Sequence, residues 1–227
     1  MSKCDQCIIR RLNALKSLHS DELRSITKSK NEKVFNRGDY IFKEGKYLNG
    51  IYCISSGICK LVKSVEGKIR ILKFIKQGDL LGLRSLMSND SAKLSAIAMN
   101  RTKVCFIPKE EIINLTRQNY NFSHKITDAM CHDLLKSNDK VVELSTKNVE
   151  NRLAAFLLEF EEDFGLDKNG FIKFKLSREE LAGIVGTATE SLIRKLSVFK
   201  NKNLLIMKEK KIKLINKKKL KEISLIT

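Results

Sequence analysis

Two short helices separated by a glycine are the strongest structural signal in the chain, and they lie within residues 176–204. Ser177 is followed three residues later by Glu180, a spacing that forms a capping box, in which each side chain satisfies a backbone N–H at the start of a helix. Gly186 then stands where that helix must end and the chain must turn. Between them, the residues that recur at helical spacing and predict a buried stripe are Leu181, Ile184 and Val185.

A second helix is predicted to begin near residues 187–189. Its apolar residues, which we expect on the inward side, are Leu192, Ile193, Leu196 and Phe199. The residues left for the outward side are Thr189, Glu190, Ser191, Arg194 and Lys195. A polar helix start of this kind, held at an angle by a preceding helix, fits the major groove of DNA.

Short β-rich runs fill residues 33–107, and glycine-containing turns separate them. Many brief strands with regular turns predict a small β-barrel or jelly roll. Cys53 and Cys59 alternate with their neighbours along two of these runs and are expected to be packing residues. The expected strands lie at 34–35, 40–42, 50–54, 58–62, 70–75, 92–99 and 103–107.

The pattern changes to helix after Pro108. A short helix is predicted at 109–117 and a longer one at about 121–147, while another helix at 20–28 precedes the strands. The spacing in the long helix favours a symmetric dimer, and the alternative is a single helix that lies on its own barrel. The positions that follow the seam of a parallel coiled coil are Ile126, Met130, Leu134, Ser137, Val141 and Leu144.

A third region follows a break near 147–148. We predict a helix at 149–164, a strand at 171–176 and, after the helix pair, a hairpin with strands at 204–207 and 211–215. A helix pair followed by such a hairpin is the arrangement of a winged helix. Lysines of the hairpin would contact phosphates, which fixes the position of the protein on DNA without reading its sequence.

In order and spacing these segments resemble the Crp/Fnr superfamily of bacterial transcription regulators. The string Thr189-Glu190-Ser191-Leu192-Ile193-Arg194 resembles the recognition helix of that family, and residues 145–156 resemble its hinge, particularly in the oxygen-sensing branch. The resemblance implies an α+β fold. Its expected parts are a jelly-roll or β-barrel sensor domain at 1–117, similar to a cyclic-nucleotide-binding domain, a long dimerisation helix at 118–147, and a winged helix-turn-helix DNA-binding domain at 148–227.

The resemblance also implies roles at the helix pair. Glu190 would accept a hydrogen bond from a cytosine amino group, and Arg194 would donate to guanine O6 and N7. Thr189 stands where the cyclic-AMP branch has arginine, and Ile193 where the oxygen-sensing branch has serine, so the operator sequence is not implied. The expected DNA-contacting residues are Ser177, Thr187, Thr189, Glu190, Ser191, Arg194, Lys195, Lys208 and Lys210.

The implied function is that of a dimeric, sequence-specific transcription regulator, whose sensor domain responds to a small effector or redox signal and repositions the recognition helices. The implied partners are a palindromic double-stranded operator, a second copy of the chain and RNA polymerase, the last through residues 88–92. The alternative is a small-ligand-binding or metal- and redox-sensing β-barrel without sequence-specific DNA output. No catalytic motif in the sequence supports an enzyme.

The charge of the chain agrees with a polyanionic partner. The net charge is +18, and residues 194–227 contribute +10 of it, with twelve lysine or arginine residues against two acidic ones. The alternative is a solvated lysine-rich surface, but the helix pair beside it favours contacts with phosphates. No apolar run approaches the roughly 20 residues that cross a bilayer, and no signal peptide is recognisable, so we expect a cytoplasmic protein without a membrane partner.

Members of the family that bind cyclic nucleotides use one cassette, with a glutamate for the ribose and an arginine followed by serine or threonine for the phosphate. Leu83 replaces the glutamate and Leu94 the arginine, so a cyclic phosphate would lack its charged partner. We therefore do not expect cyclic AMP to bind. Binding of an unrelated small ligand stays an open alternative. The positions of this candidate effector pocket are Leu83, Arg84, Ser85, Leu94 and Ser95.

Six cysteines in a reducing compartment are thiols or metal ligands before they are disulfides. Cys4 and Cys7 match the first two N-terminal cysteines that hold a four-iron four-sulfur cluster in the oxygen-sensing branch, and Cys105 matches its strand cysteine. Asn13 stands where the third N-terminal cysteine should be. Three interpretations stay open: surface thiols with Cys105 as a small core residue, an iron–sulfur or other metal centre with an atypical ligand, and a reversible Cys4–Cys7 disulfide. The cofactor is therefore unknown.

Overall fold

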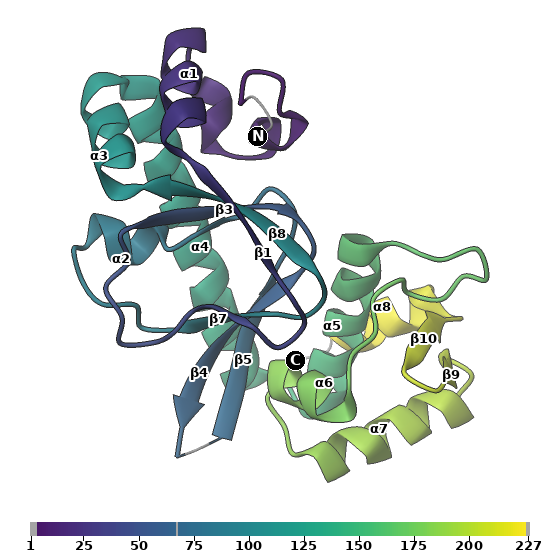
Figure 1. The fold of residues 1–227 in the computed structure, drawn as a ribbon. Coiled ribbons are helices and arrows are strands. Elements are labelled where there is room, and N and C mark those ends of the chain that lie inside the picture. Colours follow the sequence, from purple (N-terminus) through teal and green to yellow (C-terminus); the bar gives the residue numbers. More distant parts are fainter. Residues whose placement is uncertain (1–3, 67, 226–227) are drawn as a thin grey trace. The chain divides into compact units, whose positions relative to one another are not determined.

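The computed structural model describes residues 4–66 and 68–225. Its internal contacts divide the chain into an N-terminal unit, Met1–Leu135, and a C-terminal unit, Lys136–Thr227; Figure 1 shows the chain coloured from purple to yellow. The long helix α4 (Tyr120–Thr146) crosses this boundary. None of the helices in the described ranges combines the length and the apolarity needed to span a membrane.

Two four-stranded antiparallel sheets build the N-terminal unit. Their strand orders are β1-β8-β3-β6 and β2-β7-β4-β5, so consecutive strands alternate between the sheets, except for the hairpin of β4 and β5. This arrangement confirms the predicted jelly roll. The first sheet contains β1 (Asn31–Phe35), β3 (Gly50–Ser56), β6 (Leu80–Leu81) and β8 (Thr102–Pro108). The second contains β2 (Tyr40–Phe42), β4 (Cys59–Val65), β5 (Lys68–Ile75) and β7 (Ser95–Ala98).

Inward-facing side chains from both sheets form the core between them. The turn between β3 and β4 requires a glycine at position 57. There φ is +91°, and a Cβ would lie 2.6 Å from the Cα of Thr102. Only glycine fits this position without moving the neighbouring backbone. The buried residues of the core are Ile41, Ile54, Cys59, Ile75, Leu81, Ala96 and Val104.

A second buried cluster joins the first sheet to helices. Ile51 of β3 lies in it, together with Phe122 and Ile126 from the first turns of α4, and Met130 packs against it. Ile126 and Met130 were predicted to lie on a dimer seam, but Ile126 is in the core of its own unit and the half-buried Met130 packs against that core. The helices around this cluster include η1 (Ile8–Leu12), η2 (Ala14–Ser17), α1 (Ser20–Ser29), α2 (Leu83–Met87) and α3 (Lys109–Gln118).

The C-terminal unit combines helices with one hairpin. Helix α5 packs against α6, α7 and α8, and its Leu153 and Leu157 are fully buried. The helix pair and the hairpin after it confirm the predicted winged helix. The elements after α4 are α5 (Val149–Phe164), α6 (Arg178–Val185), α7 (Thr189–Asn201), β9 (Leu205–Lys208), β10 (Lys211–Leu214) and α8 (Lys217–Leu225).

The structure corrects one predicted element of this unit and adds another. The strand expected at 171–176 is wrong: the segment forms only an isolated bridge between Leu166 and Ile172. The carboxylate of Asp167 accepts the N–H groups of residues 169 and 171, and this turn bends the chain so that only a short stretch can pair. Helix α8 was not predicted, because only Leu220 and Ile223 mark its buried side among many lysines.

Candidate nucleic-acid interface and sensor sites

Helices α6 and α7 place the predicted helix pair and its turn. The Ser177 hydroxyl accepts the backbone N–H of Glu180 at 3.1 Å, and the Glu180 carboxylate accepts the N–H of Ser177 at 2.9 Å. Gly186 ends α6 in the left-handed conformation, with φ of +74°. The N–H groups of Gly186 and Thr187 both donate to the carbonyl of Ala182. The capping box and the glycine stop are therefore confirmed.

One side of α7 is buried and the opposite side is exposed. Leu192, Leu196 and Phe199 pack inward as predicted. Ile193 was expected beside them but is 46% exposed, because a helix turns by about 100° from one residue to the next. The exposed residues recur at the spacing of a single helix face, which we call the recognition face: Glu190, Ile193, Arg194 and Ser197.

Two charged side chains of the recognition face have no interaction partner among the described residues. Within residues 4–66 and 68–225, the side chains of Glu190 and Arg194 form no ion pair and no hydrogen bond. Ile193 places an apolar group beside them. A carboxylate, a guanidinium and a branched alkyl group on one face can accept from cytosine, donate to guanine and contact the methyl group of thymine.

Lys195, predicted to contact DNA, is held by another helix. Its ammonium group lies 3.0 Å from Glu150 of α5, and Lys202 lies 3.6 Å from the same carboxylate. The hydrogen bond from Lys195 is the main reason that the pKa of Glu150 is lowered. Sequence reasoning did not find Glu150, because the two helices that meet here are far apart along the chain.

The N-terminus of α7 leaves backbone donors available. Ala188 stands at the N-cap position and offers no side-chain oxygen to the first N–H groups of the helix. Three polar residues predicted to contact DNA lie around this end and are half-buried: Thr187, Thr189 and Ser191. Free N–H groups at a helix N-terminus attract a phosphate. The hydroxyl of Ser177, by contrast, is already engaged in the capping box.

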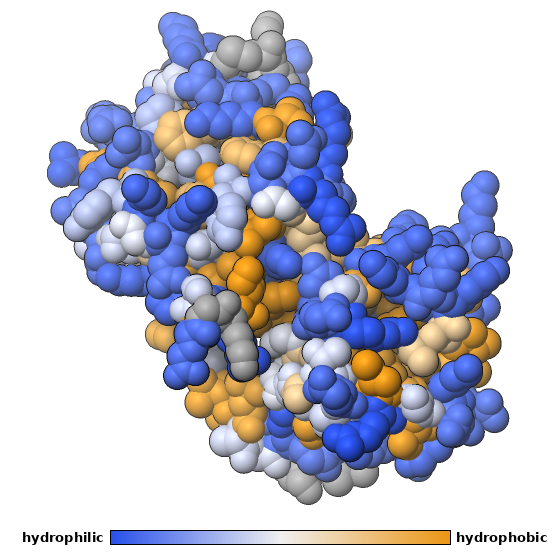
Figure 2. Space-filling model, turned by 60° about the horizontal axis from the view of Figure 1, so that its bottom comes forward, coloured by the Kyte–Doolittle hydropathy of each residue, from blue (hydrophilic) through white to orange (hydrophobic). Residues whose placement is uncertain are grey.

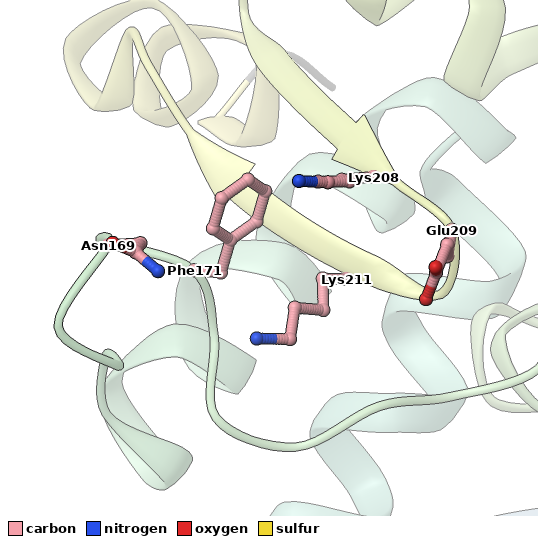
Figure 3. Close-up of a pocket in the computed structure, with 5 residues that line it drawn as sticks. All are labelled: Asn169, Phe171, Lys208, Glu209 and Lys211. Atoms are coloured by element: carbon pink, nitrogen blue, oxygen red, sulfur yellow. The ribbon is translucent and has the colours of Figure 1, made fainter.

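The hairpin β9–β10 forms the predicted wing, with Glu209 and Lys210 in its two-residue turn. Lys208 and Lys210 are exposed, whereas Lys211 is paired with Asp167 at 2.8 Å and lowers the pKa of Asp167 to about 2. The hairpin therefore presents lysines to solvent, as a phosphate-contacting wing requires. A cavity of about 350 Å³ lies beside the hairpin. Figure 3 shows the residues that line it: Asn169, Phe171, Lys208, Glu209 and Lys211.

The apolar positions of the candidate effector pocket do not offer polar contacts to a nucleotide. Leu83 is buried in the core of the N-terminal unit, and Leu94 is half-buried. The hydroxyl of Ser95 accepts the backbone N–H of Glu44 at 2.9 Å. Ser85 is half-buried, and its carbonyl accepts the N–H of residue 90. In the structure these positions contribute to the packing and the backbone hydrogen bonding of the N-terminal unit.

The one arginine of the pocket is directed to α4. Arg84 lies 2.5 Å from the carboxylate of Asp133, and Lys73 of β5 reaches the same carboxylate at 2.5 Å. Burial alone would raise the pKa of Asp133, but the hydrogen bond from Lys73 and the charge of Arg84 lower it overall. The structure thus ties β5 and α2 to α4 through one ion-pair cluster.

We expect cyclic AMP not to bind at micromolar concentration. Its phosphate would enter a site without a free guanidinium, and an unpaired, desolvated anion costs several kcal/mol. Isothermal titration of the full-length protein measures this directly, and the Arg84→Ala variant is the control for recruitment of Arg84 away from Asp133. Binding in the micromolar range or tighter, lost in that variant, would contradict the expectation.

Four cysteines are neighbours in the N-terminal unit. Cys53 of β3 stands opposite Cys105 of β8, so their side chains share one face of the sheet. Burial, reinforced by the nearby Cys105, Cys7 and Cys4, raises the pKa of Cys53 to about 12. Burial likewise raises the pKa of Cys105. Both thiols stay protonated near neutral pH and are weak nucleophiles. The sequence predicted only a packing role for Cys53. Its proximity to the other three cysteines was not predictable, because they belong to segments that are distant along the chain.

The surroundings of these thiols bear on the predicted metal centre. In the part of the chain that the structure describes, no three His, Cys, Asp or Glu side chains come together as metal ligands. Asn13, at the position of the missing cysteine, donates to the carbonyl of Gly78 at 2.8 Å and to the Cys53 sulfur at 3.5 Å. It therefore holds the N-terminal segment to the sheets by hydrogen bonds.

The second half of α4 carries apolar side chains that its own chain leaves exposed. In Figure 2, apolar patches interrupt a surface that is mostly hydrophilic. An exposed apolar stripe along a helix is the kind of surface that a partner helix covers. The exposed apolar residues of α4 are Leu134, Leu135, Val141, Val142 and Leu144, and three of them lie on the predicted seam.

Comparison with known proteins agrees with this description of both units. A family model of the cyclic nucleotide-binding domain matches residues 32–119. A family model of the Crp-like helix-turn-helix domain matches residues 151–223. Together the two matches span more than two thirds of the chain.

Individual proteins are similar along most of the chain. The fumarate and nitrate reduction regulatory protein of Yersinia pestis is 29% identical over 208 residues, which cover 89% of this chain and 82% of that protein. The transcriptional activator protein Anr of Pseudomonas protegens is 27% identical over 207 residues, which cover 89% and 84%. The solved structure of FixK2 from Bradyrhizobium japonicum shares the fold, with a TM-score of 0.78 at 22% identity, over 87% of this chain and 98% of that one.

Proposed function

Because the chain belongs to the Crp/Fnr superfamily of transcription regulators, we propose that it acts as a homodimer that binds a palindromic operator and changes transcription when its sensor domain receives a signal. The observation that carries this proposal is the recognition face, where two unpaired charged groups and an apolar side chain are exposed together on α7. A DNA major groove offers a partner to each of these three groups.

The recognition face suggests which base edges are read. Arg194 would donate two hydrogen bonds to guanine, and Glu190 would accept one from the amino group of cytosine. Ile193 adds a contact that the sequence pattern did not indicate, because an exposed alkyl group in the groove favours the methyl group of thymine. We therefore propose an operator half-site in which a G·C pair lies beside an A·T pair.

The contacts that carry no sequence information come from the ends of the motif. We propose that the first N–H groups of α7, with Thr187, Thr189 and Ser191 around them, bind one phosphate. Lys208 and Lys210 of the wing would bind others. Lys195 has a different role in this proposal: its pairing with Glu150 positions α7 on α5, at the edge of the DNA surface.

Two copies of the chain would meet along the exposed apolar face of α4. A two-fold symmetric dimer presents two recognition helices to major grooves about one helical turn apart, and a palindromic operator matches this symmetry. Association buries apolar side chains that are otherwise in water, which supplies the stabilisation for the pairing.

The signal is received by the N-terminal unit in this proposal, as a small effector or a redox change. The cluster of Arg84, Lys73 and Asp133 supports a route from the sensor to the dimer helix, since it joins α2 and β5 to α4. As a regulator of transcription, the protein would work in the cytoplasm and contact RNA polymerase, with residues 88–92 as the candidate surface by family relation.

Selection of binding sites from a random-sequence duplex library tests the proposal. We expect a palindromic consensus, and we expect affinity to fall linearly with the logarithm of salt concentration as phosphate contacts are lost. A fluorescence-anisotropy titration of the selected duplex against a scrambled duplex gives the specificity ratio. Equal affinity for both duplexes at every salt concentration would instead support the alternative, a sensing β-barrel without sequence-specific DNA output.

A further inference from the structure

A buried arginine connects three parts of the C-terminal unit. Arg152 lies in the first turn of α5 and is 8% exposed. Its Nε donates to the carbonyl of Val185 at 2.9 Å, and one terminal nitrogen donates to the carbonyl of Gly186 at 3.0 Å. The other terminal nitrogen donates to the carbonyl of Lys147. One guanidinium group thus holds the end of α6, the turn of the helix pair and the residue that follows α4.

The chemistry of these acceptors makes the contact a strong one. Val185 is the last residue of α6, and Lys147 follows directly after α4, so their carbonyls belong to the negative ends of two helices. A guanidinium carries its donors on three nitrogens in a fixed plane and can reach carbonyls that lie apart from one another, whereas the three donors of a lysine share one nitrogen. A buried cation is costly unless it is fully hydrogen-bonded, and here Arg152 satisfies carbonyls that the two helices leave open.

Two further contacts tie the same parts together. A Cβ added at Gly186 would lie 2.7 Å from Cδ2 of Leu144, so the last turns of α4 pack directly on the turn before α7. Glu150, two residues before Arg152, holds Lys195 and Lys202 of α7 and its C-cap. The end of α4, the start of α5 and both ends of the exposed helix α7 are therefore linked through contacts within one unit.

We infer that Arg152 is a positioning residue that transmits the orientation of α4 to the recognition helix. The inference rests on the proposed function, because it needs two copies joined along α4. In such a dimer the contacts of Arg152 fix the distance and the angle between the two α7 helices. They therefore set the spacing of half-sites that the protein accepts, although Arg152 touches no base.

The test compares the selected operator with versions that carry one base pair more or less at the centre. One base pair rotates the second half-site by roughly 35° around the DNA axis. We expect the full-length wild-type protein to lose about tenfold or more in affinity on this change. The Arg152→Lys variant should lose less than about threefold, because one ammonium nitrogen cannot reach all three carbonyls that separate nitrogens of Arg152 bind. Affinity for a duplex with one half-site should stay within about threefold of wild type.

Two more variants make the result decisive. Arg178→Lys is the matched control: this arginine also donates to a backbone carbonyl, that of Glu209 at 3.4 Å, but does not reach α4, so wild-type spacing selectivity should persist. Glu150→Gln removes the ion pairs to Lys195 and Lys202 and should relax spacing selectivity in part. If Arg152→Lys does not fold, as judged by thermal unfolding, Glu150→Gln decides alone.

The inference is wrong if a folded Arg152→Lys protein keeps the spacing selectivity of the wild type. When Glu150→Gln decides alone, the same result in that variant overturns the inference. Failure of the proposed function looks different, since the wild-type protein would then select no palindromic duplex at all.

Discussion

Replacing Arg194 by alanine is expected to weaken operator binding by about 1–3 kcal/mol at each half-site and to remove the preference for one base pair there. The side chain is exposed on the recognition face, and among the described residues it has no partner that would compete with guanine. Because a dimer uses two copies, the total loss in affinity is roughly thirtyfold to twenty-thousandfold. Titration of operators with each of the four bases at every position measures both effects.

The wing lysine Lys210 provides the matched control for Arg194. Lys210→Ala should weaken binding to all sequences alike and should reduce the slope of log affinity against log salt by about one per lost phosphate contact. Arg194→Ala should change base preference instead. If Arg194→Ala lowered affinity equally for all bases, Arg194 would be a phosphate ligand and the assignment to guanine would be wrong.

Replacing Val141 by lysine is expected to dissociate the dimer and to lower operator affinity by about a hundredfold or more. Val141 is 65% exposed in the single chain, so in a dimer its burial would contribute about 1–3 kcal/mol per copy. The variant loses this contribution and brings two ammonium groups together on the seam, where burial of unpaired charge is costly. Sedimentation velocity at micromolar concentration gives the oligomeric state, and the same preparation gives the operator affinity.

Ile8 is the control for the loss of an exposed apolar side chain elsewhere. It is 74% exposed on η1, and Ile8→Lys should leave both the dimer and operator binding intact. A dimeric Val141→Lys protein with unchanged operator affinity would show that the exposed face of α4 is not the dimer interface.

The sequence alone was sufficient where the signal is local. The capping box of Ser177 and Glu180 and the stop at Gly186 placed α6, and the helix predicted at 149–164 coincides with α5. Such signals act within a few residues, so no knowledge of the rest of the fold is needed. The jelly roll followed in the same way from the regular alternation of short strands and glycine turns.

Features that depend on tertiary contacts were not predictable in this way. Ile193 was assigned to the core by residue type, but α7 turns it to the exposed side. Of the candidate site, Glu190 and Arg194 were identified, whereas the pairing of Lys195 with Glu150 was not, since their helices are distant in sequence. The contact between Cys53 and Cys105 and the triple contact of Arg152 were missed for the same reason: each joins distant segments.

Packing of the first turns of α4 inside the N-terminal unit has a consequence for gene dosage. Phe122 and Ile126 complete a core that one chain possesses by itself, so formation of the proposed dimer would join two folded chains and would be governed by mass action. While most chains are unpaired, the abundance of the DNA-competent species rises with the square of chain abundance. A twofold change in synthesis would then give about a fourfold change in the concentration of the proposed dimer, before any ligand acts.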